Sequence, residues 1–377
     1  MNEQSGSNRT PLYEQHLEAG AKVIEFGGWL MPVQYTGIVA EHKMVRQEAG
    51  IFDLSHMGRV YMSGSAAARF LQFLATNDVT KLSEGQVQYS LLCNKAGGVR
   101  DDILVYRLAD SEYMLVVNAS NRVKVLGWME EIKASSFKDA KASEIVIDDR
   151  TKETVMIGIQ GPKSESILQA MVDIELQKMR YYHVSPAKVI GEECLISRTG
   201  YTGEDGFEVI LPVEAGIRLW RDFSQMAAKG EVGLAGLGAR DTLRMEAGMP
   251  LYGHELDETI NPLEAGLSRF VRMDKGDFIG RDALLLIAQE GPKRQLVGLE
   301  IPDRAIARQG TEVLAGSSKV GQVTSGSFSP TLGRSVAMAL IDADKADGSL
   351  PLEVVVRGAA HPANLVSLPF YRRKRNK

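Results

Sequence analysis

Three closely spaced strand-like runs constrain the fold of this chain more than any other feature. They are residues 86–93 (QVQYSLLC), 99–108 (VRDDILVYRL) and 113–119 (YMLVVNA). The segments between them, 94–98 and 109–112, are short and contain Gly, Asn or Asp, which is typical of tight turns. The runs therefore predict a β-meander.

The rest of the chain mixes helices with strands. Because the strands do not alternate strictly with helices, the pattern argues against a doubly wound parallel sheet and predicts an α+β class. Thr10 and Pro11 are expected to be the N-cap and first position of a helix that Gly20 ends. Further helices are predicted at 37–49, 65–76, 121–134, 162–172 and 276–290, and further strands at 154–159, 186–198 and 206–212.

The length of 377 residues exceeds what one hydrophobic core usually supports, so two or more domains are expected. The best candidate linker is Gly291–Arg294 (GPKR). Short strands and turns follow it, which predicts an all-β module, either a sandwich or a barrel. Glycine is abundant, 37 residues, and this favours tight turns and antiparallel sheet.

Composition excludes several classes of function. The net charge is −4, whereas a nucleic-acid-binding protein usually has a strongly basic domain, so a nucleic-acid partner is not expected. No apolar stretch is long enough to span a bilayer, so no membrane association is predicted. The first ten residues, MNEQSGSNRT, do not have the pattern of a signal or transit peptide, and a cytoplasmic location is expected. The basic tail YRRKRNK is interpreted as a frayed terminus.

The two cysteines and six histidines indicate no metal site. Cys93 and Cys194 lie far apart without a CxxC motif, which fits a reducing compartment and incidental thiols. The histidines form no HExxH or comparable spacing. We therefore expect no metal cofactor.

Asp101 and Asp102 are adjacent carboxylates in a predicted strand, where aspartate is uncommon. Period-two alternation points them to opposite faces. In the simpler interpretation Asp101 is solvated and Asp102 caps backbone amides. In the alternative, one carboxylate lies against a ligand as a base or an electrostatic partner.

The stretch TGYTGEDGFEVILP, residues 199–212, combines a Gly-rich turn with a strand. A hairpin is the simpler interpretation, and Glu204 and Asp205 would repel a phosphate. Glu208, however, lies one step into the strand between apolar neighbours, and its burial is unfavourable unless it is hydrogen-bonded or paired. Both a plain hairpin and a ligand loop remain open.

A third segment, AGLGARDTLRMEAGMPLYG (235–253), leads from glycines into a helix that begins near Ala239. Arg240 and Arg244 lie four residues apart, and like charges at this spacing weaken a helix unless they have partners. Asp241 or Glu246 could pair with them, so a structural network and a ligand site are both possible.

Taken together, these segments resemble the aminomethyltransferases of the glycine cleavage system, the T-protein family. The resemblance runs from residue 10 to residue 371. The stretches that carry it are TPLYEQHLEAGAKVIEFGGWLMPVQY (10–35), FDLSHMG (52–58), GGVRDDILVYR (97–107), GYTGEDGFE (200–208), GLGARDTLRMEAGMPLYG (236–253), TSGSFSPTLG (324–333) and SLPFY (367–371).

The resemblance implies a cloverleaf fold that binds tetrahydrofolate, with a C-terminal barrel-like domain. It places a folate-binding region at 8–275, made of two intertwined α+β subdomains with the meander in one of them (roughly 50–140), and an all-β domain at 292–373. The implied reaction takes the methylene carbon from the aminomethyl-lipoyl arm of the H-protein to tetrahydrofolate. The products are 5,10-methylenetetrahydrofolate and ammonia.

The resemblance also implies roles for individual residues. Asp102 is the essential carboxylate, Glu208 accepts hydrogen bonds from the pterin edge, and Arg240 accompanies it, so these three side chains are expected to converge. The other implied folate contacts are Met57, Tyr89, Asn118, Tyr181, Tyr201 and Arg372.

Two alternatives to the transferase remain at this point. One is a folate-dependent demethylase of a small sulfonium or N-methyl compound on the same fold. The other is a folate-binding scaffold related to iron–sulfur assembly factors, whose reactive cysteine lies in a Lys-Gly-Cys-type loop. Cys93 and Cys194 lie in strand-like contexts instead.

Overall fold

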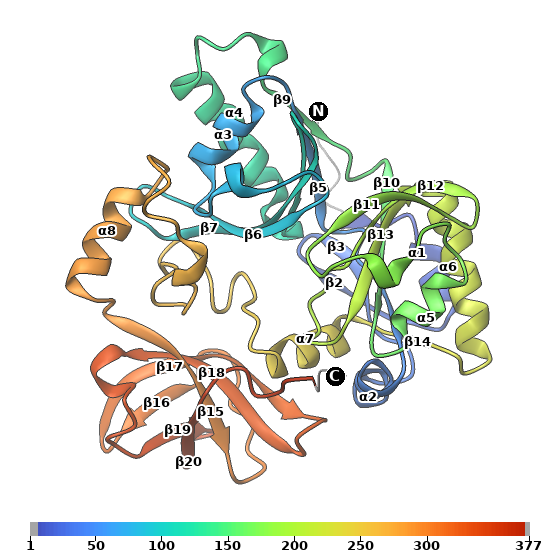
Figure 1. The fold of residues 1–377 in the computed structure, drawn as a ribbon. Coiled ribbons are helices and arrows are strands. Elements are labelled where there is room, and N and C mark those ends of the chain that lie inside the picture. The colour runs from blue at the N-terminus through green and yellow to red at the C-terminus, as the bar shows by residue number, and fades with distance from the viewer. Residues whose placement is uncertain (1–6, 374–377) are drawn as a thin grey trace. The chain divides into compact units, whose positions relative to one another are not determined.

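The computed structural model describes residues 7–373 of the chain (Figure 1). These residues form two compact units, each assembled from separate segments of sequence. The first unit contains the described residues up to Phe70, 81–88 and 104–241, and the second contains 71–80, 89–103 and the described residues from Thr242 onward. Most of the N-terminal segment (1–6) and of the basic tail (374–377) lies outside the described residues, and so do the predictions made for them.

The predicted β-meander is confirmed. Its strands are successive neighbours in a five-stranded sheet of order β6-β7-β8-β5-β9. Asn94 builds the first turn, because its Oδ1 accepts hydrogen bonds from the backbone N–H groups of Ala96 and Gly98, each at 3.0 Å. The strands are β6 (Val87–Cys93), β7 (Val99–Ala109), β8 (Glu112–Val117), β5 (Gly58–Ser63) and β9 (Val146–Asp149).

A six-stranded sheet lies in the first unit, with strand order β11-β12-β13-β10-β4-β14. Its neighbours pair antiparallel except at the edge, where β14 pairs parallel with β4. The central strands are buried along most of their length. The strands are β11 (Val184–Val189), β12 (Glu192–Ser197), β13 (Gly206–Pro212), β10 (Thr154–Gln160), β4 (Gly50–Asp53) and β14 (Gly233–Leu234).

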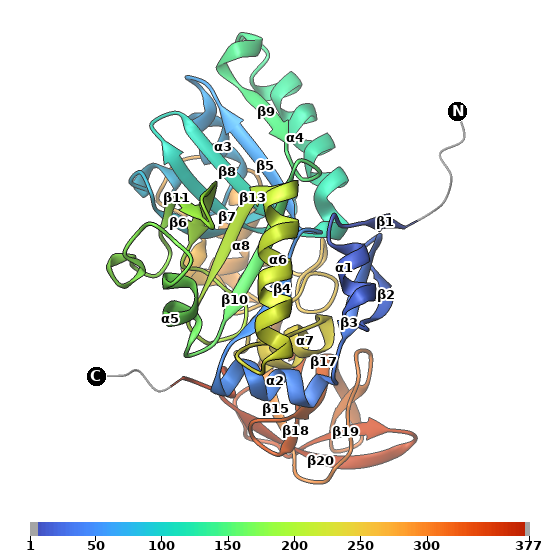
Figure 2. The same cartoon turned by 90° about the vertical axis from the view of Figure 1, so that its right-hand side faces the viewer.

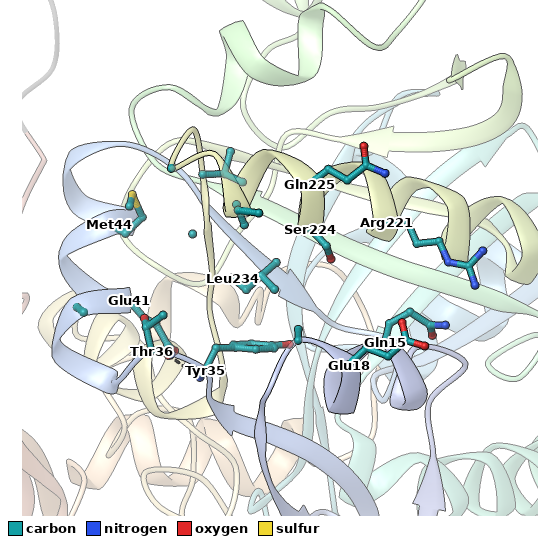
Figure 3. A pocket seen from close by; sticks show the side chains of 17 residues that line it. Gln15, Glu18, Tyr35, Thr36, Glu41, Met44, Arg221, Ser224, Gln225 and Leu234 are labelled. Carbon is teal, nitrogen blue, oxygen red and sulfur yellow. Dashed lines mark hydrogen bonds between the residues drawn. The ribbon is translucent and has the colours of Figure 1, made fainter.

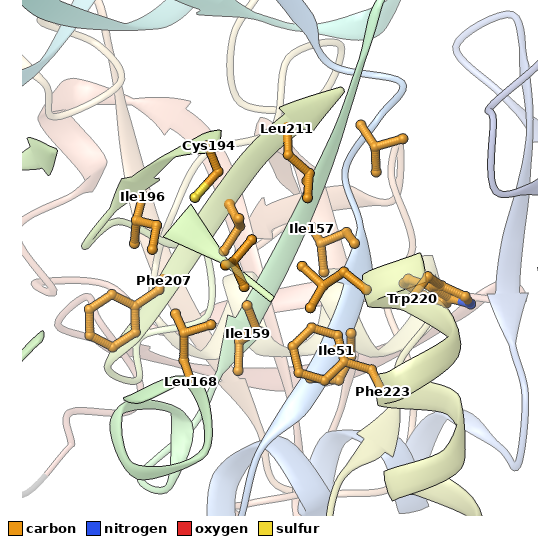
Figure 4. Close-up of a cluster of buried hydrophobic side chains, with 14 of the residues drawn as sticks. Ile51, Ile157, Ile159, Leu168, Cys194, Ile196, Phe207, Leu211, Trp220 and Phe223 are labelled. Carbon is orange, nitrogen blue, oxygen red and sulfur yellow. The ribbon is translucent and has the colours of Figure 1, made fainter. Parts of the chain in front are cut away.

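Helix α6 (Val213–Ala228) covers one face of this sheet (Figure 2). Its buried residues, among them Leu219, Trp220 and Phe223, recur at helical spacing and enter the apolar core shown in Figure 4. A Cβ at Gly216 would lie 2.5 Å from Val155 Cβ. Glycine at this position therefore lets helix and sheet approach closely.

The predicted C-terminal all-β module is a closed barrel of order β15-β18-β17-β16-β19-β20 in the second unit. Its interior is aliphatic, with Leu299, Val313, Val323 and Ile341 fully buried. The strands are β15 (Arg294–Ile301), β16 (Glu312–Ala315), β17 (Ser318–Ser329), β18 (Arg334–Asp342), β19 (Leu352–Val356) and β20 (Ala359–Val366). The α+β class with mainly antiparallel sheets and a barrel is thus confirmed.

The remaining elements complete the architecture. A three-stranded sheet of order β1-β3-β2 contains β1 (Asn8–Arg9), β3 (Trp29–Gln34) and β2 (Lys22–Phe26). The other α-helices are α1 (Tyr13–Glu18), α2 (Ile38–Gln47), α3 (Ala67–Leu74), α4 (Arg122–Ser136), α5 (Ser164–Gln169), α7 (Leu237–Glu246) and α8 (Arg281–Glu290). Short 3₁₀ helices lie at Val79–Lys81, Ala119–Asn121, Ala142–Glu144, Leu176–Lys178, Ser268–Phe270 and Ala343–Lys345. Within residues 7–373, no helix is long and apolar enough to cross a membrane.

Two helix starts differ from their predictions. Helix α8 begins at Arg281 and not at 276. Helix α1 begins after Leu12, which caps it without a side-chain hydrogen bond, so the expected N-cap role of Thr10 was wrong. The Thr10 hydroxyl donates instead to Asp53 Oδ2 at 2.7 Å. The Thr10 hydroxyl therefore binds a buried carboxylate that is distant in sequence, and not the backbone N–H groups at the start of the helix.

Two hairpin turns place a side chain in the left-handed region of the backbone. Ile190 (φ 50°) and Arg357 (φ 52°) each precede a glycine of positive φ, Gly191 (84°) and Gly358 (82°). Two positive φ values in a two-residue hairpin loop are the pattern of a type I′ turn, which favours Asn-Gly. Ile190 packs against the core, whereas Arg357 is exposed.

We expect Arg357→Asn to raise the free energy of unfolding by about 0.5–1 kcal/mol, because asparagine tolerates the left-handed region better than arginine does. Urea unfolding of the two proteins measures the difference. Ile190→Asn is the matched control and should not be stabilising, since it also removes packing against the core. An unchanged midpoint for Arg357→Asn would show that this turn stores no significant strain.

Candidate functional site

The Gly-rich segment at 199–206 forms the turn between β12 and β13. Arg46 Nη1 fixes it from α2, donating to the Thr202 carbonyl oxygen at 2.7 Å and to Glu204 Oε1 at 2.9 Å. Asp205 pairs with Arg198, and Gly203 supplies a positive φ of 80°. The two acidic side chains of the turn are therefore used to hold its shape, and the remaining carboxylate is Glu208.

Glu208 is a buried carboxylate held by hydroxyl groups. Thr199 Oγ1 donates to its Oε2 at 2.6 Å, and the Tyr106 hydroxyl lies 3.5 Å from the same oxygen. Burial raises the pKa of Glu208, while the hydrogen bond from Thr199 and the charge of Arg240 act in the opposite direction. Within residues 7–373 both of these hydrogen bonds reach Oε2, and a carboxylate can accept further hydrogen bonds on its other oxygen, Oε1.

Arg240 lies in the first turns of α7, with its guanidinium carbon 4.7 Å from the centre of the Tyr201 ring. This cation–π contact joins the helix to the Gly-rich turn. Arg244, four residues later, is buried and pairs with Glu255 at 2.8 Å, a partner that lies outside the segment considered from sequence. The two arginines therefore serve different purposes.

The turn that follows β4 is held by a buried polar network. Asp53 lies 2.9 Å from His16 Nε2, and its Oδ1 accepts from the Ser55 backbone N–H at 2.8 Å. Although burial acts to raise it, the hydrogen bond and charge of His16, together with the hydrogen bonds of Ser55, lower the pKa of Asp53 to about 2. Buried Arg59 donates to the carbonyl oxygens of Ser55 and Met57. The turn that carries the half-buried Met57 is thus held in place by these hydrogen bonds.

His56 lies in the same turn. It is buried, its ring lies 6.0 Å from that of Phe26, and its Nδ1 has no hydrogen-bond partner among the residues the structure describes. Burial, followed by the positive charge of Arg240, lowers the pKa of His56 to about 3. The imidazole is therefore neutral at physiological pH.

This shift predicts a pH dependence of stability. Between about pH 6 and pH 4 the unfolded chain binds a proton at His56 and the native chain does not, so stability falls as pH falls, by at most about 1.4 kcal/mol per pH unit. Urea unfolding at several pH values measures this slope. His56→Gln should make it shallower, and a variant with the slope of the parent protein would contradict the prediction.

In the second unit, Asp102 accepts a hydrogen bond on Oδ2 from the Tyr89 hydroxyl at 3.0 Å. The Tyr89 ring packs edge-on against Phe270, with 4.7 Å between ring centres. Asp102 is half-buried, while Asp101 is fully buried. The simpler interpretation of Asp101 as a solvated residue was therefore wrong, because the face it shares with Ile103 points into the protein.

The other predicted folate contacts lie on separate elements. Asn118 is half-buried at the start of the Ala119–Asn121 turn, where its carbonyl oxygen accepts from Asn121 N at 3.0 Å. Tyr181 is 45% exposed and packs edge-on against Tyr182. Arg372 is exposed beyond the last strand of the barrel. The role of each in folate binding stays a prediction.

The structure thus groups the predicted residues within each unit. Glu208, Arg240 and Tyr201 lie together in the first, and Asp102 and Tyr89 lie together in the second. The convergence of the two groups stays a prediction. Sequence reasoning missed Thr199 and Tyr106, the hydroxyl groups that hold Glu208, because their contacts appear only once the strands pair.

Comparison with family models covers both parts of the chain. Residues 12–275 match the GCVT N-terminal domain, and residues 294–372 match the glycine cleavage T-protein C-terminal barrel domain. The chain belongs to the glycine cleavage T-protein family. The resemblance inferred from the sequence is therefore confirmed.

T-protein relatives match over nearly their whole length. The chain is 48% identical over 366 residues to an aminomethyltransferase of Desulfitobacterium hafniense (strain DSM 10664 / DCB-2), which covers 97% of this chain and 98% of the relative. It is also 48% identical over 367 residues to an aminomethyltransferase of Moorella thermoacetica (strain ATCC 39073 / JCM 9320), with the same coverage of each chain.

A solved T-protein structure confirms the family fold. The crystal structure of the glycine cleavage system aminomethyltransferase T from Bartonella henselae superimposes with a TM-score of 0.90 and 32% sequence identity. The match covers 99% of this chain and 100% of that one. The predicted T-protein fold class is thus supported by sequence and by structure.

Proposed function

We propose that this chain is the aminomethyltransferase of a glycine cleavage system. It transfers the methylene carbon from the aminomethyl-lipoyl arm of H-protein to tetrahydrofolate and releases ammonia. The observation that carries the proposal is the match of 48% identity with an aminomethyltransferase over nearly the full length of both chains. The chain also matches both family-model domains.

Glu208 and Arg240 are proposed to recognise the pterin of tetrahydrofolate. A pterin edge carries an N–H and an exocyclic NH₂ side by side, and a carboxylate can accept from both with fixed orientation. The two hydroxyl groups hold Glu208 by its Oε2, which would leave Oε1 to face the pterin. Arg240, held against Tyr201, would donate to the pterin carbonyl and partly neutralise Glu208.

Asp102 is proposed to assist the chemistry at the folate N5/N10 side. Two bonds of the methylene carbon would break, the bond to nitrogen as ammonia leaves and the bond to sulfur as the lipoyl thiol is released, while N5 and N10 of folate bond to this carbon. The carboxylate would stabilise the iminium-like cation and accept or relay a proton from the folate nitrogen. The hydrogen bond from Tyr89 fixes the orientation of this carboxylate. General acid–base assistance of this kind contributes about 10²–10⁴-fold to a rate.

The proposed partners are a lipoylated H-protein and folate, and we propose a cytoplasmic location. Among the described residues, no group of three or more His, Cys, Asp or Glu side chains is placed to hold a metal ion. Cys93 and Cys194 are buried, and burial raises the pKa of each thiol to about 12. A thiol of this kind is a poor nucleophile, which argues against the scaffold with a reactive cysteine.

The demethylase alternative is not favoured, because the relatives that match along nearly the whole chain are named aminomethyltransferases. One assay separates the two activities. The purified chain is mixed with aminomethylated H-protein and tetrahydrofolate, and ammonia and 5,10-methylenetetrahydrofolate are measured.

Stoichiometric formation of both products supports the transferase. A parallel reaction replaces H-protein with small sulfonium or N-methyl donors and measures methyl transfer to folate. Turnover only with the small donors would overturn the proposal in favour of the demethylase. Folate binding without product in any reaction would favour a scaffold.

A further inference from the structure

A cavity of about 660 Å³ lies in the first unit among α1, α2, α6 and β14 (Figure 3). Its volume is within the range of about 300–1,000 Å³ typical of small-molecule sites. None of the residues proposed above to bind folate lines it. It is therefore a site separate from the proposed folate contacts.

Three helices line this cavity, each with residues three or four positions apart that share one face of the helix. Apolar groups form one part of the lining, and Figure 3 shows Met44 and Leu234 away from the end at which Gln15, Glu18 and Arg221 lie. The helical lining residues are Gln15, Glu18 and Ala19 at α1, Ala40, Glu41 and Met44 on α2, and Arg221, Ser224, Gln225, Ala227 and Ala228 on α6.

Several polar groups of the lining already have protein partners. Glu41 accepts four backbone N–H groups, three on Oε1 and that of Gly236 on Oε2. The Ser224 hydroxyl donates to the Trp220 carbonyl oxygen at 2.9 Å, and the Tyr35 hydroxyl lies 3.0 Å from His16 Nδ1. These groups therefore shape the cavity and have little capacity left for a charged ligand.

Three groups at the polar end have no such partners. Gln15 Oε1 is a buried acceptor without a hydrogen bond in the described part of the chain. Glu18 and Arg221 are both exposed, and neither has an ion pair or hydrogen bond from its side chain to any of residues 7–373. Because α1 packs against α6, an acceptor, an anion and a cation lie at one end of the same cavity.

We propose that this cavity binds an α-amino acid with a large apolar side chain. Arg221 receives the carboxylate, Gln15 Oε1 and Glu18 receive the ammonium group, and the side chain extends toward Met44 and Leu234. A zwitterion matches both unpaired charges at once, and its N–H group satisfies the buried acceptor of Gln15, which is unfavourable to leave unpaired. The apolar part of the lining selects against small or polar side chains.

Calorimetric titration of the full chain with defined probes tests the proposal. Leucine and phenylalanine should bind with Kd values on the order of 1 mM or below. Glycine lacks the side chain, leucinamide lacks the carboxylate charge, and N-acetyl-leucine lacks the ammonium charge. Each of these probes should bind about tenfold more weakly than leucine. No binding of leucine or phenylalanine up to about 10 mM, or equal binding of all five probes, would overturn the proposal.

Two variants locate the binding. Arg221→Gln should weaken leucine about tenfold and leave leucinamide unchanged, since the amide never used the guanidinium. Lys229→Gln is the matched control, because Lys229 is an exposed cation at the end of the same helix and does not line the cavity. Ala40→Trp, at an exposed lining position, should abolish binding by filling the space. Leucine affinity that is unchanged in Arg221→Gln, or equally reduced in Lys229→Gln, would refute the site.

Discussion

Replacing Asp102 with asparagine is expected to lower turnover by about 10²–10⁴-fold and to leave the affinity for tetrahydrofolate within a few-fold. The amide keeps the size of the side chain and can still accept the hydrogen bond that the Tyr89 hydroxyl donates at 3.0 Å. It loses the negative charge that would take a proton or stabilise a cation in the reaction. Single-turnover ammonia release with saturating H-protein and folate measures the chemical step directly.

Tyr89→Phe is the matched control for this experiment. It removes the hydroxyl that orients Asp102 and retains the ring packed against Phe270, so the carboxylate stays charged but is held less firmly. Turnover should fall about tenfold or less, the loss expected for one hydrogen bond. Near-normal turnover in Asp102→Asn would remove this carboxylate from the mechanism. An equal loss in both variants would assign Asp102 a positioning role.

The parts of the fold that could be predicted from sequence are those set by local pattern. Alternating apolar residues and the Asn94–Gly98 turn specify the meander, and the density of short strands after Gly291 specifies a β-module. Local pattern did not decide between a sandwich and a barrel, because closure depends on the pairing of β15 with β20, which lie far apart in the sequence. The barrel was predicted by the family resemblance alone.

At the candidate site, the sequence could not identify the interaction partners that lie far away along the chain. Like-charge spacing showed that Arg240 and Arg244 needed partners, yet it could not identify Tyr201 for one and Glu255 for the other. Alternation separated Asp101 from Asp102 but could not say which face is the interior. The catalytic role proposed for Asp102 comes from family resemblance, since the chemistry of an aspartate pair does not identify a substrate.

A charged Glu208 is unfavourable for the stability of the fold but is needed for its proposed role in pterin binding. Because burial raises its pKa, the native state binds a proton there more readily than the unfolded chain does, and the charged form destabilises the fold at neutral pH. Glu208→Gln should therefore be at least as stable as the parent protein in urea. A buried charge that does not benefit the fold is a strong candidate for a functional group.

Glu208→Ala should weaken tetrahydrofolate binding by about 2–4 kcal/mol, roughly thirtyfold to several hundredfold in Kd. The pterin N–H groups would lose a charged acceptor, and Glu208→Gln should also bind weakly, since its NH₂ group faces other donors. Calorimetric titration measures the affinity of both variants for tetrahydrofolate. The affinity of the parent protein for tetrahydrofolate should fall at lower pH, because acidification protonates a carboxylate whose pKa is raised.

Tyr106→Phe is the control, since it removes only the hydroxyl at 3.5 Å and should change Kd little. Comparable losses in Tyr106→Phe and Glu208→Ala would indicate a general disturbance of the β13 region, whereas unchanged affinity in Glu208→Gln would exclude this carboxylate from pterin recognition.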